Sequence, residues 1–68
     1  MTLPEAITYA LVRCNGGLRT EQIAALINRY QWHVRKDGQP VTSAQVYATV
    51  VRYPAQFCKA EGRIMLMI

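Results

Sequence analysis

The chain has 68 residues, with eight Lys and Arg against four Asp and Glu, so its formal net charge is 8 − 4 = +4. This length accommodates one small domain, or one module of a longer protein, and it excludes a two-domain enzyme, a dinucleotide-binding α/β domain and a β/α barrel. Because 51% of the residues are hydrophobic and only 18% are charged, the composition also excludes an intrinsically disordered chain.

A first helix is predicted over residues 3–14. Thr2 and Glu5 have the spacing of a capping box, and Pro4 suits a first helical turn. Apolar residues then follow at the i, i+3, i+4, i+7 spacing of one buried face, formed by Ile7, Ala10, Leu11 and Cys14. We expect the helix to end at Asn15-Gly16-Gly17, because glycine readily adopts the left-handed conformation of a C-cap.

A second helix is predicted over residues 21–31. Thr20 is its expected N-cap, and the charge of Glu21 in the first turn favours the helix dipole. Its apolar stripe consists of Ile23, Leu26, Ile27 and Tyr30. Between the two helices, Leu18-Arg19 is expected to pair as a strand of one or two residues.

The helical pattern breaks over residues 32–41, where Asp37-Gly38 is a turn signal. A loop of this length indicates either a function or a packed excursion. We expect Trp32 to fill the core beside Tyr30. His33 is expected to be a surface or hydrogen-bonded residue and not a metal ligand.

A third helix is predicted to begin after the N-cap Thr42 and to end near Tyr53, because Pro54 cannot continue it. Its expected inner face consists of Val46, Tyr47, Val50 and Tyr53. Its expected polar stripe consists of Gln45, Thr49 and Arg52. This helix therefore combines a buried face with a polar face that carries no acidic residue.

The last part of the chain predicts a β-hairpin, with strands over residues 57–59 and 64–68 and a turn over residues 60–63. The order is helix, short strand, helix, helix, strand, strand. This order predicts an α+β fold, a winged helix-turn-helix with three helices plus a C-terminal hairpin wing, in a single domain over residues 1–68.

Several short segments, in order along the chain, also match one family of winged-helix domains. They are Ala6-Ile7 with Leu11, Gly16-Gly17, Ile23-Ala24 with Ile27, Ser43-Ala44-Gln45-Val46-Tyr47 with Val50, and Pro54-Ala55-Gln56-Phe57 with Gly62. Together they resemble the HARE-type helix-turn-helix domain over roughly residues 2–66. The family occurs in bacterial RNA polymerase delta subunits, in Additional-sex-combs-like chromatin proteins and fused to restriction enzymes. The resemblance implies work around DNA or its machinery.

The first functional hypothesis is weak, salt-sensitive binding of double-stranded DNA in the regulation of transcription, in chromatin or in DNA modification. A recognition helix enters the major groove with its N-terminal half toward the bases. The residues expected to face bases are Ser43, Gln45 and Thr49. The residues expected to hold phosphates are Arg35, Lys36, Arg52, Lys59 and Arg63. Asp37 and Glu61 fall on the same strip and dilute its charge.

One departure from the family pattern bears on this hypothesis. Ala48, Thr49 and Val51 stand at positions of the third helix that are often charged in members of the family. Arg52 is then the one cation of that helix, which disfavours strong base-specific recognition.

The second hypothesis is a protein-interaction module within a transcription or restriction assembly, without direct contact to DNA. Its partner is a protein of the transcription or DNA-processing machinery. The expected contact surface is an exposed apolar patch formed by Tyr9, Val12, Met65 and Met67 together with Ile68.

The sequence does not predict an enzyme, a metal site or a cofactor. Gly16-Gly17 lacks the Lys and Ser/Thr that complete a phosphate-binding loop. Cys14, Cys58 and His33 are too few and too far apart for a structural zinc site, so we expect two free, mostly buried thiols. No apolar run approaches the ~20 residues of a membrane span. We therefore expect a cytoplasmic, nucleoid-associated or otherwise intracellular location.

Overall fold

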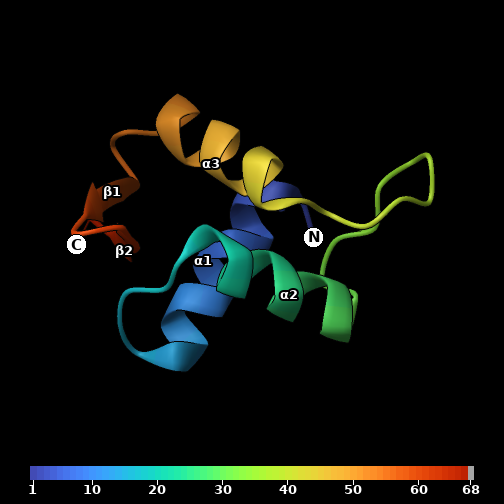
Figure 1. The fold of residues 1–68 in the computed structure, drawn as a ribbon, viewed down its shortest axis with the longest axis horizontal. Helices are drawn as coiled ribbons and strands as arrows, with labels where there is room; N and C mark the ends of the chain where they lie inside the picture. The colour runs from blue at the N-terminus through green and yellow to red at the C-terminus, as the bar shows by residue number, and fades with distance from the viewer. Residues whose placement is uncertain (68) are drawn as a thin grey trace.

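In the computed structural model, which describes residues 1–67, three helices precede an antiparallel hairpin (Figure 1). The elements are α1 (Leu3–Cys14), α2 (Thr20–Tyr30), α3 (Ser43–Arg52), β1 (Phe57–Ala60) and β2 (Arg63–Leu66). The hairpin lies at one end of the molecule, and the loop between α2 and α3 projects at the other. The predicted α+β class and the order of three helices and a hairpin are confirmed, and the topology is winged-helix-like.

The capping box predicted for α1 is present. The Glu5 N–H donates to Thr2 Oγ1 at 3.3 Å, and the Thr2 N–H donates to Glu5 Oε1 at 2.9 Å. The helix ends at Cys14, as predicted, and Asn15 takes the left-handed conformation with φ 50°. The prediction that Cys14 is buried is wrong: its side chain is exposed, because the last turn of α1 extends beyond α2 (Figure 1).

The Glu5 carboxyl should make the stability of the folded chain depend on pH. Its pKa is lowered first by the hydrogen bond from the Thr2 backbone and then by the Thr2 hydroxyl. Because the folded pKa lies below the unfolded pKa, the stabilisation is present above the unfolded value and is lost as the pH falls through the folded value. The wild-type chain should therefore lose thermal stability in acid faster than Glu5→Gln, which keeps an acceptor oxygen but does not titrate. Melting temperatures that fall equally in the two proteins from neutral to acid pH would contradict this linkage.

Helix α2 starts one residue earlier than predicted, so Thr20 is its first residue and not its cap. Arg19 is the N-cap, and its N–H donates to Gln22 Oε1 at 2.9 Å. A glutamine three residues after the cap was the signal for this earlier start. At the other end Gln31 lies outside the helix as a left-handed C-cap with φ 53°. Tyr30 is 49% exposed and not part of the buried stripe, because it occupies the last helical position beyond the core.

Thr42 caps α3 as predicted, and its Oγ1 accepts from the Gln45 N–H at 3.2 Å. Only Val46 and Val50 of this helix are buried. The prediction that Tyr47 and Tyr53 belong to the inner face is wrong. Tyr47 follows Val46 and is therefore turned by one helical step away from the core, and Tyr53 lies past the end of the helix.

The hairpin turns over two residues, Glu61 with φ 53° and Gly62 with φ 78°, not over the predicted four. Both strands therefore extend closer to the turn than predicted, with Ala60 paired to Arg63. Two central residues with positive φ are typical of the turn that matches strand twist. The last residue of the predicted second strand, residue 68, lies outside the described residues.

A single β-bridge between Leu18 and Ile64 joins the segment between α1 and α2 to the hairpin. Leu18 donates its N–H to Ile64 O at 3.1 Å and accepts the Ile64 N–H at 2.7 Å. The predicted pairing of Leu18-Arg19 is confirmed for Leu18 alone, since Arg19 is the N-cap of α2. Gly17 approaches β2 so closely that a Cβ placed there would lie 3.0 Å from Arg63 Cβ and 3.1 Å from Met65 Cγ.

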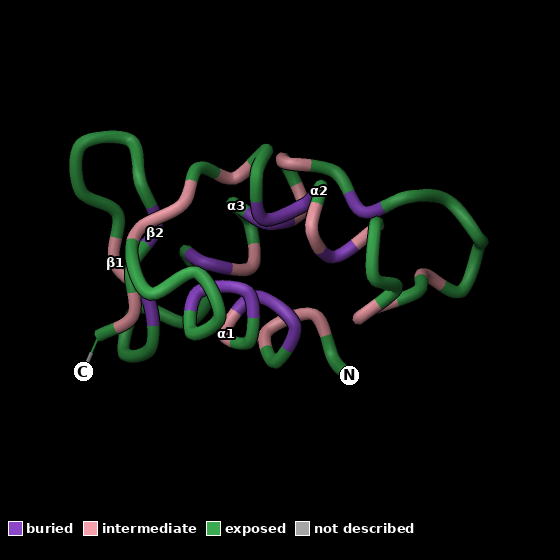
Figure 2. Tube along the Cα trace, turned by 90° about the horizontal axis from the view of Figure 1, so that it is seen from below, coloured by how far each residue is buried: buried purple, intermediate pink, exposed green. Residues whose placement is uncertain are grey.

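The core lies where the three helices face one another and meet the hairpin (Figure 2). It consists of Ala6, Ile7, Ala10, Leu11, Ile23, Ala24, Ile27, Val41, Val46, Val50, Phe57 and Ile64. Trp32 is half-buried and packs against this core. Its ring stacks on Tyr30 with centroids 5.2 Å apart and meets Tyr9 edge-on at 4.8 Å. The predicted position beside Tyr30 is confirmed, but Trp32 packs against the core and does not fill it.

One side chain fixes the two ends of the loop between α2 and α3. The amide of Asn28 donates to Val41 O at 2.9 Å and accepts the Val41 N–H at 2.9 Å. Both groups of Val41 are thereby satisfied beside the core, where an unpaired amide is costly. The sequence does not reveal this contact, because the two residues lie 13 positions apart.

Candidate nucleic-acid interface

An open polar groove of about 390 Å³ lies between the starts of α2 and α3 and the hairpin turn. Its lining residues are Arg19, Thr20, Glu21, Ser43, Ala44, Tyr47, Lys59, Glu61 and Gly62. The groove thus unites the first half of the predicted recognition helix with the tip of the predicted wing. Sequence reasoning did not include Arg19, Thr20 or Tyr47 in this site.

Lys59 lies beside α3. Its Nζ lies over the ring of Tyr47, 4.9 Å from the ring centroid. Such an interaction contributes about 0.5–1 kcal/mol at an exposed site. Lys59 is paired with Ile64, so both side chains occupy the face of the hairpin that is turned toward the helices. The exposed ring of Tyr47 therefore holds a cation next to the first turns of α3.

The three residues predicted to face bases have different surroundings. Ser43 lines the groove. The Gln45 Oε1 accepts the Thr42 N–H at 3.1 Å and an Arg35 N–H at 3.4 Å. The Thr49 hydroxyl donates to Gln45 O at 2.9 Å, within α3 itself. The side chains of Gln45 and Thr49 thus have intramolecular hydrogen bonds, whereas Ser43 stands at the open groove.

The two cations of the loop lie apart from the groove. Arg35 forms an ion pair with Asp37, in which Nη2 lies 2.6 Å from Oδ2. Arg35 Nη1 also donates to Pro40 O at 3.3 Å, so this side chain ties the loop together. Lys36 is exposed and has no ion pair within residues 1–67. Because this loop projects at the end opposite the hairpin, Arg35 and Lys36 are separated from Lys59 (Figure 1).

Arg63 occupies the other face of the hairpin from Lys59. Side chains alternate along a strand, and Arg63 precedes the inward-facing Ile64. Its Nη1 donates to Gly17 O at 3.2 Å. Arg52 is exposed in the last turn of α3 and has neither an ion pair nor a side-chain hydrogen bond in the described part of the chain.

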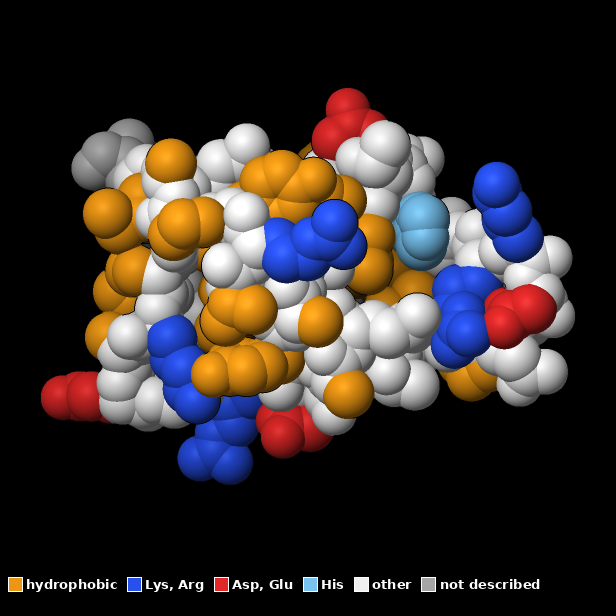
Figure 3. Space-filling view, turned by 90° about the horizontal axis from the view of Figure 1, so that it is seen from above, with side chains coloured by type: hydrophobic (Ala, Val, Ile, Leu, Met, Phe, Trp, Pro, Cys, Tyr) orange, Lys and Arg blue, Asp and Glu red, His pale blue; other side chains and the backbone are white. Residues whose placement is uncertain are grey.

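The five predicted phosphate contacts therefore do not form one uninterrupted strip. They occupy the loop, the end of α3 and the two faces of the hairpin. The space-filling view of the α3 side shows the Lys and Arg side chains in separate groups, with hydrophobic side chains between them (Figure 3). Of these five residues, the groove contains only Lys59, and it adds Arg19, which lies near the acidic Glu21 and Glu61.

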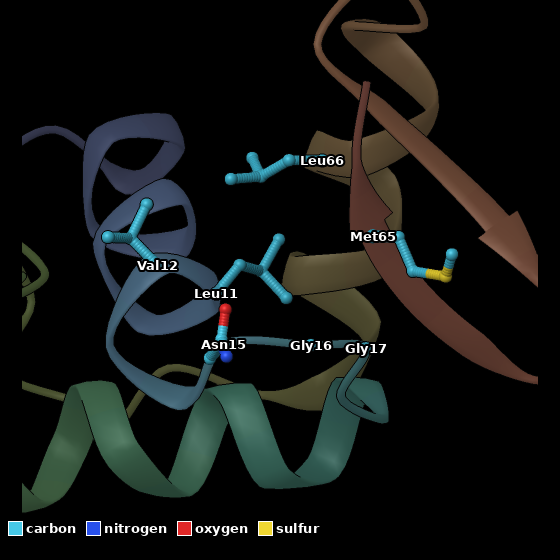
Figure 4. Close-up of a pocket in the computed structure, with 7 residues that line it drawn as sticks. All are labelled: Leu11, Val12, Asn15, Gly16, Gly17, Met65 and Leu66. Atoms are coloured by element: carbon cyan, nitrogen blue, oxygen red, sulfur yellow. The ribbon is translucent and has the colours of Figure 1, made fainter. Parts of the chain in front are cut away.

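The alternative, apolar surface is also divided. A groove of about 340 Å³ lies between α1 and the hairpin, and Val12 and Met65 both line it together with Leu11 and Leu66 (Figure 4). Tyr9 lies outside it, in a second hollow of about 380 Å³ that shares Val12. Met67 is 54% exposed and lines neither hollow. Ile68 lies outside the described residues.

The remaining candidate side chains are His33 and the two cysteines. His33 Nδ1 lies 2.9 Å from Met1 O, as expected for a hydrogen-bonded histidine. Cys14 is exposed and Cys58 is half-buried, and both are free thiols. Within residues 1–67 no three His, Cys, Asp or Glu side chains are grouped to hold a metal ion. None of the helices found in that range is both long enough and apolar enough to cross a membrane.

In comparisons with known proteins, no family model, no curated protein sequence and no solved structure matches the chain.

Proposed function

We propose that the chain is a DNA-binding winged-helix module of the HARE type, in which α3 enters the major groove and the hairpin contacts the backbone. The observation that carries the proposal is the groove in which Lys59 lies over Tyr47, beside Ser43 and Arg19. It joins a cation of the hairpin to the base-facing half of the helix. The winged-helix-like order of elements supports the same interpretation. The proposal assigns the chain no enzymatic activity.

The proposed phosphate contacts are Lys59 and Arg19 at the groove, Arg52 at the end of α3 and Lys36 in the loop. Arg35 can join them by exchanging Asp37 for a phosphate, because a partly exposed ion pair contributes little to the stability of the fold. Arg63 contacts backbone from the outer face of the hairpin. Ser43 faces the bases at the groove. Gln45 does so by releasing its bonds to Thr42 and Arg35, and Thr49 by releasing its bond to Gln45 O.

With contacts from Lys59, Arg19, Arg52 and Lys36 alone, log K should fall with log salt with a slope of about −3.6, and a contact from Arg63 would steepen it. The affinity should be in about the micromolar range or weaker. A fluorescein-labelled DNA duplex titrated at low and high salt, with anisotropy as the readout, measures both. Arg52→Glu/Lys59→Glu removes two contacts and adds two repulsions, so binding at low salt should be lost. No binding of the wild-type chain at low salt would overturn the proposal.

The matched control is Arg13→Glu/Arg29→Glu. Each double variant changes two cations to anions, so each lowers the net charge from +4 by 2 × 2 to zero. Arg13 and Arg29 lie over Tyr9 and Tyr30 and do not line the groove. The control should retain most of the binding, and circular dichroism verifies that both variants fold. Equal losses in the two variants would attribute binding to bulk charge and not to this interface.

The second candidate is a protein-interaction module, and the groove between α1 and the hairpin favours it. Val12 of α1 and Met65 of β2 both line this groove, and both are exposed apolar residues. Replacing both by glutamate should leave DNA binding unchanged if the first proposal holds. Binding of a protein partner would instead be lost when these two residues are replaced and retained in Arg52→Glu/Lys59→Glu.

A further inference from the structure

The segment between α1 and α2 carries a reactive pair that the proposed function does not use, Asn15 followed by Gly16. Asn15 is exposed in the left-handed conformation with φ 50° and ψ 49°. Neither its side-chain amide nor the N–H of Gly16 has a hydrogen-bond partner within residues 1–67. Gly16 has no Cβ to shield its nitrogen, and a Cβ added there would meet only Cys14 O at 3.9 Å.

We propose that Asn15 is a site of spontaneous deamidation and that its product loosens the hairpin. Rotation about the Asn15 Cα–C bond, from the observed ψ of 49°, first brings the Gly16 nitrogen to the same side as Cβ. The nitrogen then attacks Asn15 Cγ, a C–N bond forms, the Cγ–Nδ2 bond breaks, and ammonia leaves with the proton of the Gly16 amide. Water then opens the cyclic imide at either carbonyl, which gives aspartate or isoaspartate. The steps need water alone and involve no change of oxidation state.

The two comparable positions in the chain are protected. The other asparagine, Asn28, uses both side-chain groups to bind Val41, so a turn of its amide toward the next residue would break two hydrogen bonds. In Asp37-Gly38 the Gly38 N–H donates to Arg35 O at 3.1 Å. The nucleophile there is engaged, whereas the nitrogen of Gly16 is free.

The product affects the fold because Asn15 is joined directly to the glycine segment that packs on β2. Isoaspartate inserts a methylene into the backbone immediately before Gly16 and Gly17. Gly17 has no room to move toward β2, since the Cβ of Arg63 lies 3.0 Å from the Cβ position of Gly17. The aspartate product places a carboxylate at the C-terminal end of α1, where the helix dipole is negative. Isoaspartate therefore disturbs the bridge between Leu18 and Ile64, whereas aspartate acts mainly on the end of α1.

The modification is measured on the full chain, incubated folded in mildly alkaline buffer and then cleaved with trypsin. Cleavage after arginine separates the two asparagines into the peptides 14–19 and 20–29. Mass spectrometry should show conversion of amide to acid in 14–19 at least about tenfold faster than in 20–29. Equal rates in the two peptides, or modification of 14–19 only after unfolding in urea, would overturn the proposed site.

Gly16→Ala is the matched variant, because space is present for the added methyl and the fold should therefore be retained. It should deamidate about tenfold more slowly, since the methyl shields the attacking nitrogen. Hydrogen exchange of the Ile64 amide, which is bonded to Leu18 O, reads out the second half of the proposal. Exchange should accelerate in the isoaspartyl form and less so in Asn15→Asp. Unchanged exchange in the isoaspartyl form would overturn the link to the hairpin.

Discussion

Ile64→Ala is expected to lower the free energy of unfolding by about 2–5 kcal/mol. The Ile64 side chain is fully buried, and it is the residue of β2 whose backbone is bonded to Leu18. A stability of about 0.05–0.15 kcal/mol per residue gives roughly 3–10 kcal/mol for 68 residues. The substitution therefore removes a large part of the total, and the variant should be partly unfolded before urea is added.

Met65→Ala is the control for this prediction. Met65 is the next residue of the same strand but points to the outer face, where it is 38% exposed. Its loss should be under about 1 kcal/mol. Urea unfolding of both variants, followed by circular dichroism, measures the difference. Similar losses in the two variants would show that the hairpin is not anchored through its inner face.

Gly17→Ala is expected to destabilise the fold by about 1–3 kcal/mol, because the added methyl meets closely packed atoms of Arg63 and Met65. These atoms lie 3.0 and 3.1 Å from the position of the new Cβ, so either the strand or the glycine segment must shift. The strain should appear in the hairpin, where exchange of the Ile64 amide should become faster.

Gly16→Ala tests whether this effect belongs to the position or to glycine replacement in general. The nearest atom to its added methyl is Cys14 O at 3.9 Å, which is ordinary contact. We expect the free energy of unfolding to change by less than about 1 kcal/mol. The change should favour the folded state to the extent that alanine reduces the conformational entropy of the unfolded chain. Thermal unfolding of the two variants side by side gives the comparison. Equal melting temperatures would contradict the close approach of Gly17 to β2.

The helix ends were largely predictable from the sequence because they are set by neighbours. Thr2 with Glu5, and Thr42 with the first turn of α3, act over three residues, and the sequence displays them directly. Burial was less predictable, because it depends on which elements pack against a helix. The apolar ring of Tyr47 predicts a core position, but α3 presents to its neighbours only the narrow strip of Val46 and Val50.

The candidate site was predictable only in part, because a cation's position in the chain does not tell what its side chain contacts. The pairing of Arg35 with Asp37 spans two residues and could have been found from the turn between them. The bond from Arg63 to Gly17 spans 46 residues and could not. The opposite orientation of Lys59 and Arg63 follows from the two-residue turn, which the prediction of a longer turn concealed.

The hydrogen bonds between Asn28 and Val41 have a consequence for the evolution and engineering of this chain. They close the loop at its base, so the position of α3 should not depend on the number of residues between Asn28 and Val41. The entropy of closing a loop grows only slowly with its length, by about 0.6 kcal/mol for each doubling. Residues near Gly38, at the exposed tip, should therefore accept an inserted peptide while the helices and hairpin keep their arrangement.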